Sequence, residues 1–127
     1  MEKRIINTDK APAPVGPYNQ AVMTGNLLFV SGQIAINPLN GELVNANIED
    51  ETRQVMTNIG EILKAAEMGF ENVIKASVFV SDMGNYAKIN AVYAEYFEES
   101  MAPARELVEV ANLPKYVNVE ISVIATV

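Results

Sequence analysis

The stretch APARELVEVANLPKYVNVEISVIATV, residues 102–127, contains two predicted β-strands separated by a turn. In the second strand, 117–125, Val and Ile alternate with Asn, Glu and Ser. Such alternation is typical of a strand that is buried on one face only. Pro103 precedes the first strand, 105–110, and stops an upstream helix from continuing into it. The stretch therefore predicts a sheet with helices on one face.

The rest of the chain supplies the other elements of an α+β fold. Strands are expected at 20–24, 27–34, 42–44, 73–80, 105–110 and 117–125. Helices are expected at 50–68 and 85–98, where apolar residues recur at helical spacing. The order β-β-α-β-α-β-β, with a further short strand at 42–44, predicts a six-stranded mixed sheet with two helices on one face. Residues 1–127 are expected to form a single domain.

The composition excludes several classes of function. The chain contains no His, Cys or Trp, so thiol nucleophiles, Ser-His-Asp triads and ordinary zinc sites are excluded, and no metal site is expected. A net charge of −7 argues against nucleic-acid binding. No apolar run of about 18 residues is present that would span a membrane. Because residues 1–10 lack the apolar stretch of a signal peptide, a cytoplasmic location is expected.

Strand alternation also predicts where the charged residues of the last two strands lie. If Val108 and Val110 face the helices, Arg105 projects from the opposite face. Glu120 falls on the polar side of the last strand. We therefore expect Arg105 and Glu120 to lie on the same helix-free face, on neighbouring strands. Large apolar residues such as Phe29 are expected on that face too, which favours burial against another copy of the chain.

Five segments resemble the Rid (YjgF) family of enamine/imine deaminases. In chain order they are PVGPYNQAV, LLFVSGQIAINPLNGELV, ETRQVMTNI, VFVSDMGNYAKINAVYAEYF and PARELVEVANLPKYVNVEI. The resemblance covers nearly the whole chain. It implies a chorismate-mutase-like fold, in which three subunits close their helix-free sheet faces into a barrel with active sites in the clefts between subunits. It also implies hydrolysis of 2-imino acids or enamines, such as 2-iminobutanoate and 2-iminopropanoate, to 2-keto acids and ammonia, without a cofactor.

The resemblance also implies roles for individual residues. Arg105 corresponds to the carboxylate-binding arginine, and Glu120 to the glutamate that orients water or transfers protons. Both are therefore the expected catalytic residues. The substrate-binding positions carried over are Tyr18, Ser31, Gly32, Asn90 and Arg105. This assignment suits the chemistry, because a guanidinium binds a carboxylate through two parallel hydrogen bonds and a carboxylate can activate water.

The chain departs from the family pattern at three positions near the expected site. Glu106 replaces a small residue, Leu107 replaces a frequent cysteine, and Ser122 replaces a second glutamate. The first two changes are expected to affect the range of substrates.

Other interpretations stay open at this point. From spacing alone, Arg105 is more simply explained by an ion pair, with Glu120 or Glu109, than by ligand binding. Ser31 could merely bond to a neighbouring strand, and Tyr18 could cap the core. The same pocket could serve a non-catalytic protein that binds 2-keto or amino acids. A nuclease is disfavoured by the net charge and by the absence of histidine.

Overall fold

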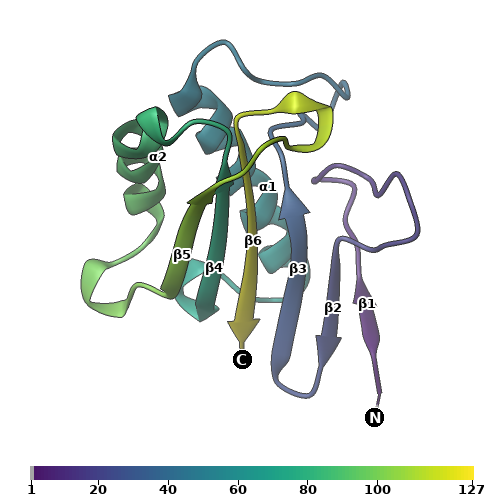
Figure 1. The fold of residues 1–127 in the computed structure, drawn as a ribbon. Helices are drawn as coiled ribbons and strands as arrows, with labels where there is room; N and C mark the ends of the chain where they lie inside the picture. Colours follow the sequence, from purple (N-terminus) through teal and green to yellow (C-terminus); the bar gives the residue numbers. More distant parts are fainter. Residues whose placement is uncertain (1) are drawn as a thin grey trace.

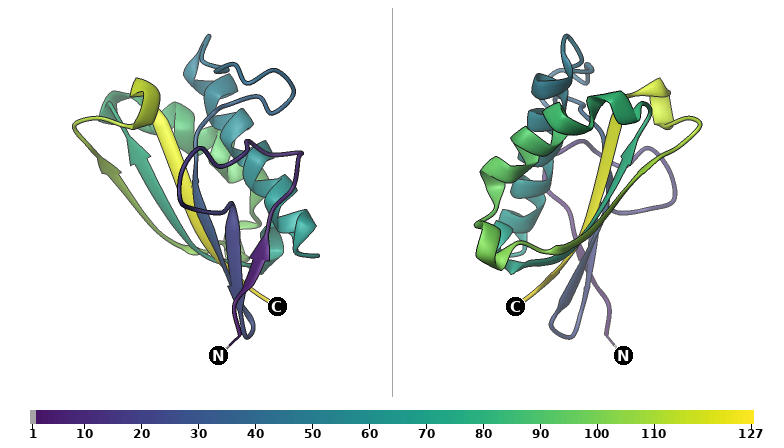
Figure 2. Two further views of the ribbon diagram at one scale, coloured as in Figure 1. Left: turned by 90° about the vertical axis from the view of Figure 1, so that its right-hand side faces the viewer. Right: turned by 60° about the vertical axis from the view of Figure 1, so that its left-hand side comes forward.

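A computed structural model describes residues 2–127 and confirms the predicted α+β fold: a six-stranded mixed sheet with two α-helices (Figure 1). The strands are β1 (Arg4–Ile6), β2 (Ala21–Thr24), β3 (Leu27–Gln33), β4 (Val73–Val80), β5 (Ala104–Glu109) and β6 (Val119–Thr126). The helices are α1 (Ile48–Ala65) and α2 (Tyr86–Tyr93). Both helices pack on the same face of the sheet and leave the other face bare (Figure 2).

The strand order across the sheet is β1-β2-β3-β6-β4-β5. Only β4 and β5 are parallel, and α2 lies in the connection between them. The prediction of a strand at 42–44 is wrong, since that segment forms a single bridge between Ile36 and Leu43. The sixth strand is β1, which pairs with β2. Its three residues are too short to show a pattern by themselves.

The core lies between the sheet and the helices, where the sequence shows strong periodicity. The fully buried residues of α1 include Val55, Ile59 and Ile62, which form the predicted stripe. The helix begins two residues earlier than predicted because Asn47 caps it, with its side chain accepting a hydrogen bond from the Asp50 N–H. Alternate residues of β6 are buried against α1, as predicted for this strand.

β5 faces the opposite way from the prediction. Arg105 pairs with Ala76 and Leu107 with Val78, and both β4 partners are fully buried under the helices. Arg105 and Leu107 therefore lie on the helix-covered face, whereas Val108 is 41% exposed. The misassignment has a physical reason: β5 is an edge strand with apolar residues on both sides, so alternation alone cannot decide which side is buried.

Buried polar side chains hold the loops at one end of the sheet. The Gln20 side chain accepts a hydrogen bond from the Thr8 N–H and donates to the Pro12 carbonyl at 2.9 Å. Asn58 of α1 donates to the carbonyls of Ile34 and Ile36 at 3.1 and 3.0 Å. These bonds fix the segment before β2 and the segment after β3, which border the cavity described below. Neither helix in the described part of the chain is long and apolar enough to cross a membrane.

Candidate functional site

Arg105 lies at the start of β5 and is held against α2 by uncharged groups. Its Nη1 donates to the Asn90 Oδ1 at 2.9 Å, and its Nη2 lies 3.4 Å from the Tyr86 hydroxyl. The guanidinium carbon lies 4.8 Å from the centroid of the Tyr93 ring. Within residues 2–127 no carboxylate comes within ion-pair distance of Arg105. We call Arg105 and its three neighbours, Tyr86, Asn90 and Tyr93, the arginine cluster.

The geometry of α2 explains how this cluster forms. Tyr86, Asn90 and Tyr93 follow one another at spacings of four and three residues, which places them on one side of the helix. The partner of the Asn90 side chain is Arg105. Glu109 does not pair with Arg105, because its carboxylate accepts a hydrogen bond from the Met83 N–H at 2.7 Å. That bond fixes the turn that leads into α2.

Glu120 lies in a second place, on the helix-free face of β6. A Cβ atom added to Gly32 would lie 2.8 Å from the Glu120 Oε2, so the glutamate occupies space that only glycine leaves open. Gly32 sits in an irregular part of β3, between Val30 and Gln33, where the pairing with β6 shifts register. Partial burial raises the pKa of the Glu120 carboxyl above its ordinary value.

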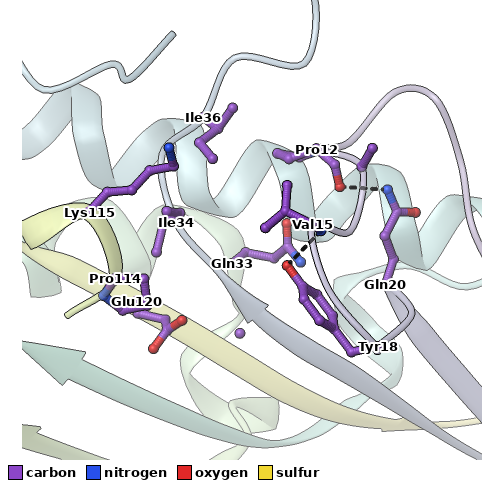
Figure 3. Close-up of a pocket in the computed structure, with 12 residues that line it drawn as sticks. Pro12, Val15, Tyr18, Gln20, Gln33, Ile34, Ile36, Pro114, Lys115 and Glu120 are labelled. Carbon is purple, nitrogen blue, oxygen red and sulfur yellow. Dashed lines mark hydrogen bonds between the residues drawn. The ribbon is translucent and has the colours of Figure 1, made fainter. Parts of the chain in front are cut away.

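Glu120 borders a cavity of about 230 Å³ at the end of the sheet (Figure 3). The polar lining is provided by Tyr18, Gln20, Gln33, Lys115 and Glu120. The apolar lining is provided by Pro12, Ala13, Val15, Ile34, Ile36 and Pro114. The Tyr18 hydroxyl accepts a hydrogen bond from the Val15 N–H at 3.4 Å, which ties the tyrosine to its own loop. We call this cavity and its lining the glutamate pocket.

The predicted site residues thus divide between two places. Asn90 lies with Arg105, whereas Tyr18 and Gly32 lie with Glu120. Ser31 is not among the residues that line the pocket, and its hydroxyl donates to the Asn19 carbonyl at 2.6 Å. That contact matches the structural interpretation of Ser31, and a substrate-binding role for it stays a prediction.

Arg105 and Glu120 lie neither on the same face nor on neighbouring strands, so this expectation from the sequence is wrong. β4 separates their strands, and the two residues project from opposite faces of the sheet. Arg105 pairs with Ala76 and Glu120 with Phe79, which offsets them by three residues along β4. Strand geometry then places their Cα atoms about 14 Å apart. A small acid bound by the guanidinium cannot reach the carboxyl group of the same chain.

Sequence analysis missed several residues that shape the two places. Tyr86 and Tyr93 were not among the predicted site residues, although their spacing around Asn90 is the signal that places them beside it. Pro114 and Lys115, in the turn before β6, were not expected to line a pocket. Lys115 adopts a φ of 55°, and no local motif in the sequence indicates this conformation.

The two places offer distinct chemistry. The arginine cluster presents a fixed positive charge that suits a carboxylate or another small anion. The glutamate pocket presents a carboxyl group that can accept or donate a proton next to an apolar wall. No group of three metal-binding side chains occurs in the part of the chain that the structure covers.

Comparisons with known proteins agree on one family. Residues 8–127 match the family model described as Endoribonuclease L-PSP. The RutC family protein PH0854 of Pyrococcus horikoshii is 54% identical, over 97% of both chains. The goat (Capra hircus) protein named 2-iminobutanoate/2-iminopropanoate deaminase is 48% identical, over 98% of this chain and 90% of its own.

Solved structures lead to the same conclusion. A Yersinia pestis protein described as a member of the conserved Rid protein family superposes with a TM-score of 0.96 at 44% identity. The match covers 99% of this chain and 100% of that one. With the sequence match extending over almost the entire length and the fold shared, the chain belongs to the Rid (YjgF) family.

Proposed function

We propose that the protein hydrolyses reactive 2-imino acids, such as 2-iminobutanoate and 2-iminopropanoate, to 2-keto acids and ammonia. The observation that carries this proposal is the guanidinium of Arg105, which is fixed in place and has no carboxylate partner in the described chain. The name of the goat relative supports the choice of substrate. A cytoplasmic location is also part of the proposal.

The active site in this proposal is formed by two copies of the chain. The arginine cluster of one subunit would face the glutamate pocket of the next, because one chain cannot bring Arg105 and Glu120 together. The helix-free face supports association, since large apolar side chains are exposed there: Ile5, Leu27, Phe29 and Val108 are 36–43% exposed. The family resemblance favours a trimer as the assembly.

The reaction follows from the two kinds of group. Arg105 binds the carboxylate of the imino acid and thereby fixes the C=N carbon. Glu120 of the partner subunit, in its ionised form, takes a proton from a water molecule as the water oxygen bonds to that carbon. The proton passes to nitrogen as the C=N double bond opens, which gives a carbinolamine. The carbinolamine hydroxyl then passes its own proton to the same nitrogen through Glu120, the C–N bond breaks, and ammonia leaves as the C=O bond forms. Water supplies the oxygen atom, so no cofactor or oxidant is required.

A coupled assay tests the proposal. A dehydratase that releases 2-iminobutanoate from threonine is mixed with the protein, and the rate of 2-oxobutanoate formation is measured. The wild type should accelerate this step, and Arg105→Ala should abolish the acceleration without changing the assembly measured by sedimentation. Arg53→Ala is the matched control, because Arg53 is a surface arginine that pairs with Glu95 at 3.0 Å. Acceleration by Arg105→Ala equal to that of the wild type would refute the proposal.

Glu120→Gln separates an enzyme from a protein that only binds keto or amino acids. In an enzyme the substitution should remove turnover and leave the affinity for 2-oxobutanoate nearly unchanged. A wild type that binds 2-oxobutanoate but never accelerates the coupled assay would instead establish the non-catalytic alternative.

A further inference from the structure

The guanidinium of Arg105 lies over the aromatic ring of Tyr93. Its central carbon lies 4.8 Å from the centroid of the Tyr93 ring, within the range of a cation–π interaction. The other neighbours of the guanidinium are an amide oxygen of Asn90 and the hydroxyl of Tyr86. All three groups are neutral, so none of them offsets the positive charge of the guanidinium.

Tyr93 is itself held rigidly. Its side chain is 6% exposed, and its ring lies 4.8 Å, centroid to centroid, from that of Phe97. Phe97 in turn makes an edge contact with Phe70 at 5.6 Å. The Tyr93 hydroxyl has no hydrogen-bond partner among residues 2–127. The ring of Tyr93, rather than its hydroxyl, is therefore the part that interacts with Arg105.

A ring and a carboxylate would hold an arginine with different consequences. A carboxylate would neutralise the guanidinium, occupy its N–H donors and compete with an incoming acid. An aromatic face attracts the cation without accepting hydrogen bonds in the guanidinium plane, so the in-plane donors stay available. Holding the guanidinium in advance also lowers the conformational entropy lost when a ligand binds.

We propose that Tyr93 is a positioning residue, whose ring fixes the plane of the Arg105 guanidinium and leaves free for a carboxylate its charge and the N–H donors that Asn90 and Tyr86 do not use. The proposal rests on the proposed function in assigning a carboxylate to Arg105. The positioning itself does not depend on turnover. Tyr93 touches no substrate in this scheme and acts only through Arg105.

The first test measures the order of Arg105 without any ligand. In ¹⁵N NMR spectra of the full-length assembled protein, restricted rotation of the guanidinium should give resolved Nη signals. Tyr93→Phe should keep these signals, because the ring remains. Replacing Tyr93 by phenylalanines with increasing numbers of ring fluorines progressively weakens the negative electrostatic potential of the ring face, with little change in the shape of the ring. Rotation should then become faster with each added fluorine.

The second test measures the binding of 2-oxobutanoate, a stable keto acid, by calorimetry. Tyr93→Phe should keep the affinity, and Tyr93→Leu should weaken it about three- to thirty-fold, the range that a cation–π contact spans. Tyr96→Leu is the matched control. Tyr96 packs on Phe70, with ring centroids 5.1 Å apart, and within residues 2–127 it is neither a hydrogen-bond nor a cation–π partner of Arg105. Its loss should change the melting temperature but leave the affinity within about two-fold.

The outcomes separate this inference from the proposed function. If ring fluorination changes neither the rate of guanidinium rotation nor the affinity for 2-oxobutanoate, Tyr93 has only a packing role and the inference is overturned. The same conclusion follows if Tyr93→Leu lowers the melting temperature and leaves the affinity unchanged. If fluorination frees the guanidinium but the wild type neither binds 2-oxobutanoate nor accelerates the coupled assay, positioning stands and the proposed function fails.

Discussion

Arg105 and Glu120 project from opposite faces of the same sheet, with β4 between their strands. Each is poorly suited to catalysis alone, since within residues 2–127 the guanidinium has no carboxyl group, and the Glu120 carboxyl group no cation, within ion-pair distance. Their separation is therefore informative. A reaction that needs both must use two copies of the chain, and this requirement can be tested directly.

Mixed assemblies should recover activity from two inactive variants. Arg105→Ala supplies an intact glutamate pocket, and Glu120→Gln supplies an intact arginine cluster. When the two variants associate randomly in equal amounts, about a quarter of the interfaces contain both intact halves. Co-expressed, differently tagged variants should therefore show about a quarter of the wild-type rate. The same variants purified separately and mixed without subunit exchange are the control. Confirmed mixed assemblies that remain inactive would contradict a shared site.

Gly32→Ala should lower the turnover number while preserving the fold. The backbone of Gly32 does not require a positive φ, so alanine is tolerated and stability should change by less than about 1 kcal/mol. The new Cβ would lie 2.8 Å from the Glu120 Oε2, and the flexible carboxylate must move away. We expect the turnover number to fall by about a hundredfold or more, because a positioned acid–base group contributes roughly 10²–10⁴-fold.

Gly25 offers a contrasting control for Gly32. Its φ is 56°, and nothing lies within 4 Å of an added Cβ. Gly25→Ala should therefore destabilise the protein by about 1–2 kcal/mol through the backbone and leave the turnover number unchanged. Equal effects of the two substitutions on turnover would show that displacement of Glu120 is not the cause.

The sequence predicts best where one face of an element is strongly buried. The stripe of α1 and the alternation of β6 lead to the correct core because each contrasts apolar and polar faces clearly. β5 lacks that contrast, since Leu107 and Val108 are similarly apolar on opposite faces. An edge strand has a neighbour on one side only, so little else fixes its orientation.

The presence or absence of a clear sequence pattern also explains which parts of the candidate site could be predicted. A polar residue within an apolar helical stripe requires a partner, so the sequence indicates that the Asn90 amide has one but does not identify it as Arg105. The glutamate pocket could not be predicted in this way. It is built by loops that are held by the buried amides of Gln20 and Asn58, and such long-range bonds leave no periodic pattern in the sequence.

The raised pKa of Glu120 should appear in the pH dependence of stability. Because burial disfavours the ionised form, the folded protein binds this proton more tightly than the unfolded chain does. The carboxyl group thus favours folding below its ordinary pKa of about 4.3, and this contribution is lost as the pH rises through the raised value. Glu120→Gln removes the ionisation. The free energy of unfolding of Glu120→Gln minus that of the wild type should therefore increase as the pH rises through this range.

Denaturant titrations at several pH values between 3 and roughly 8 would provide this comparison. Both proteins must be in the same assembly state, because association also contributes to stability. A constant difference between the two proteins over the whole range would contradict the raised pKa.

Gln20 should affect both stability and ligand affinity, because its side chain fixes one wall of the glutamate pocket. It is 2% exposed, accepts from the Thr8 N–H at 2.7 Å and donates to the carbonyls of Thr8, Ala11 and Pro12. Gln20→Leu leaves these backbone groups without partners and should lower the free energy of unfolding by about 2–4 kcal/mol. It should also raise the KM for imino acid, since Pro12 and Val15 line the pocket and are no longer fixed. Asn40→Ala, which loses one exposed turn bond to the Glu42 N–H, is the control and should leave KM unchanged. A less stable Gln20→Leu protein with the wild-type KM would show that this wall does not contact the substrate.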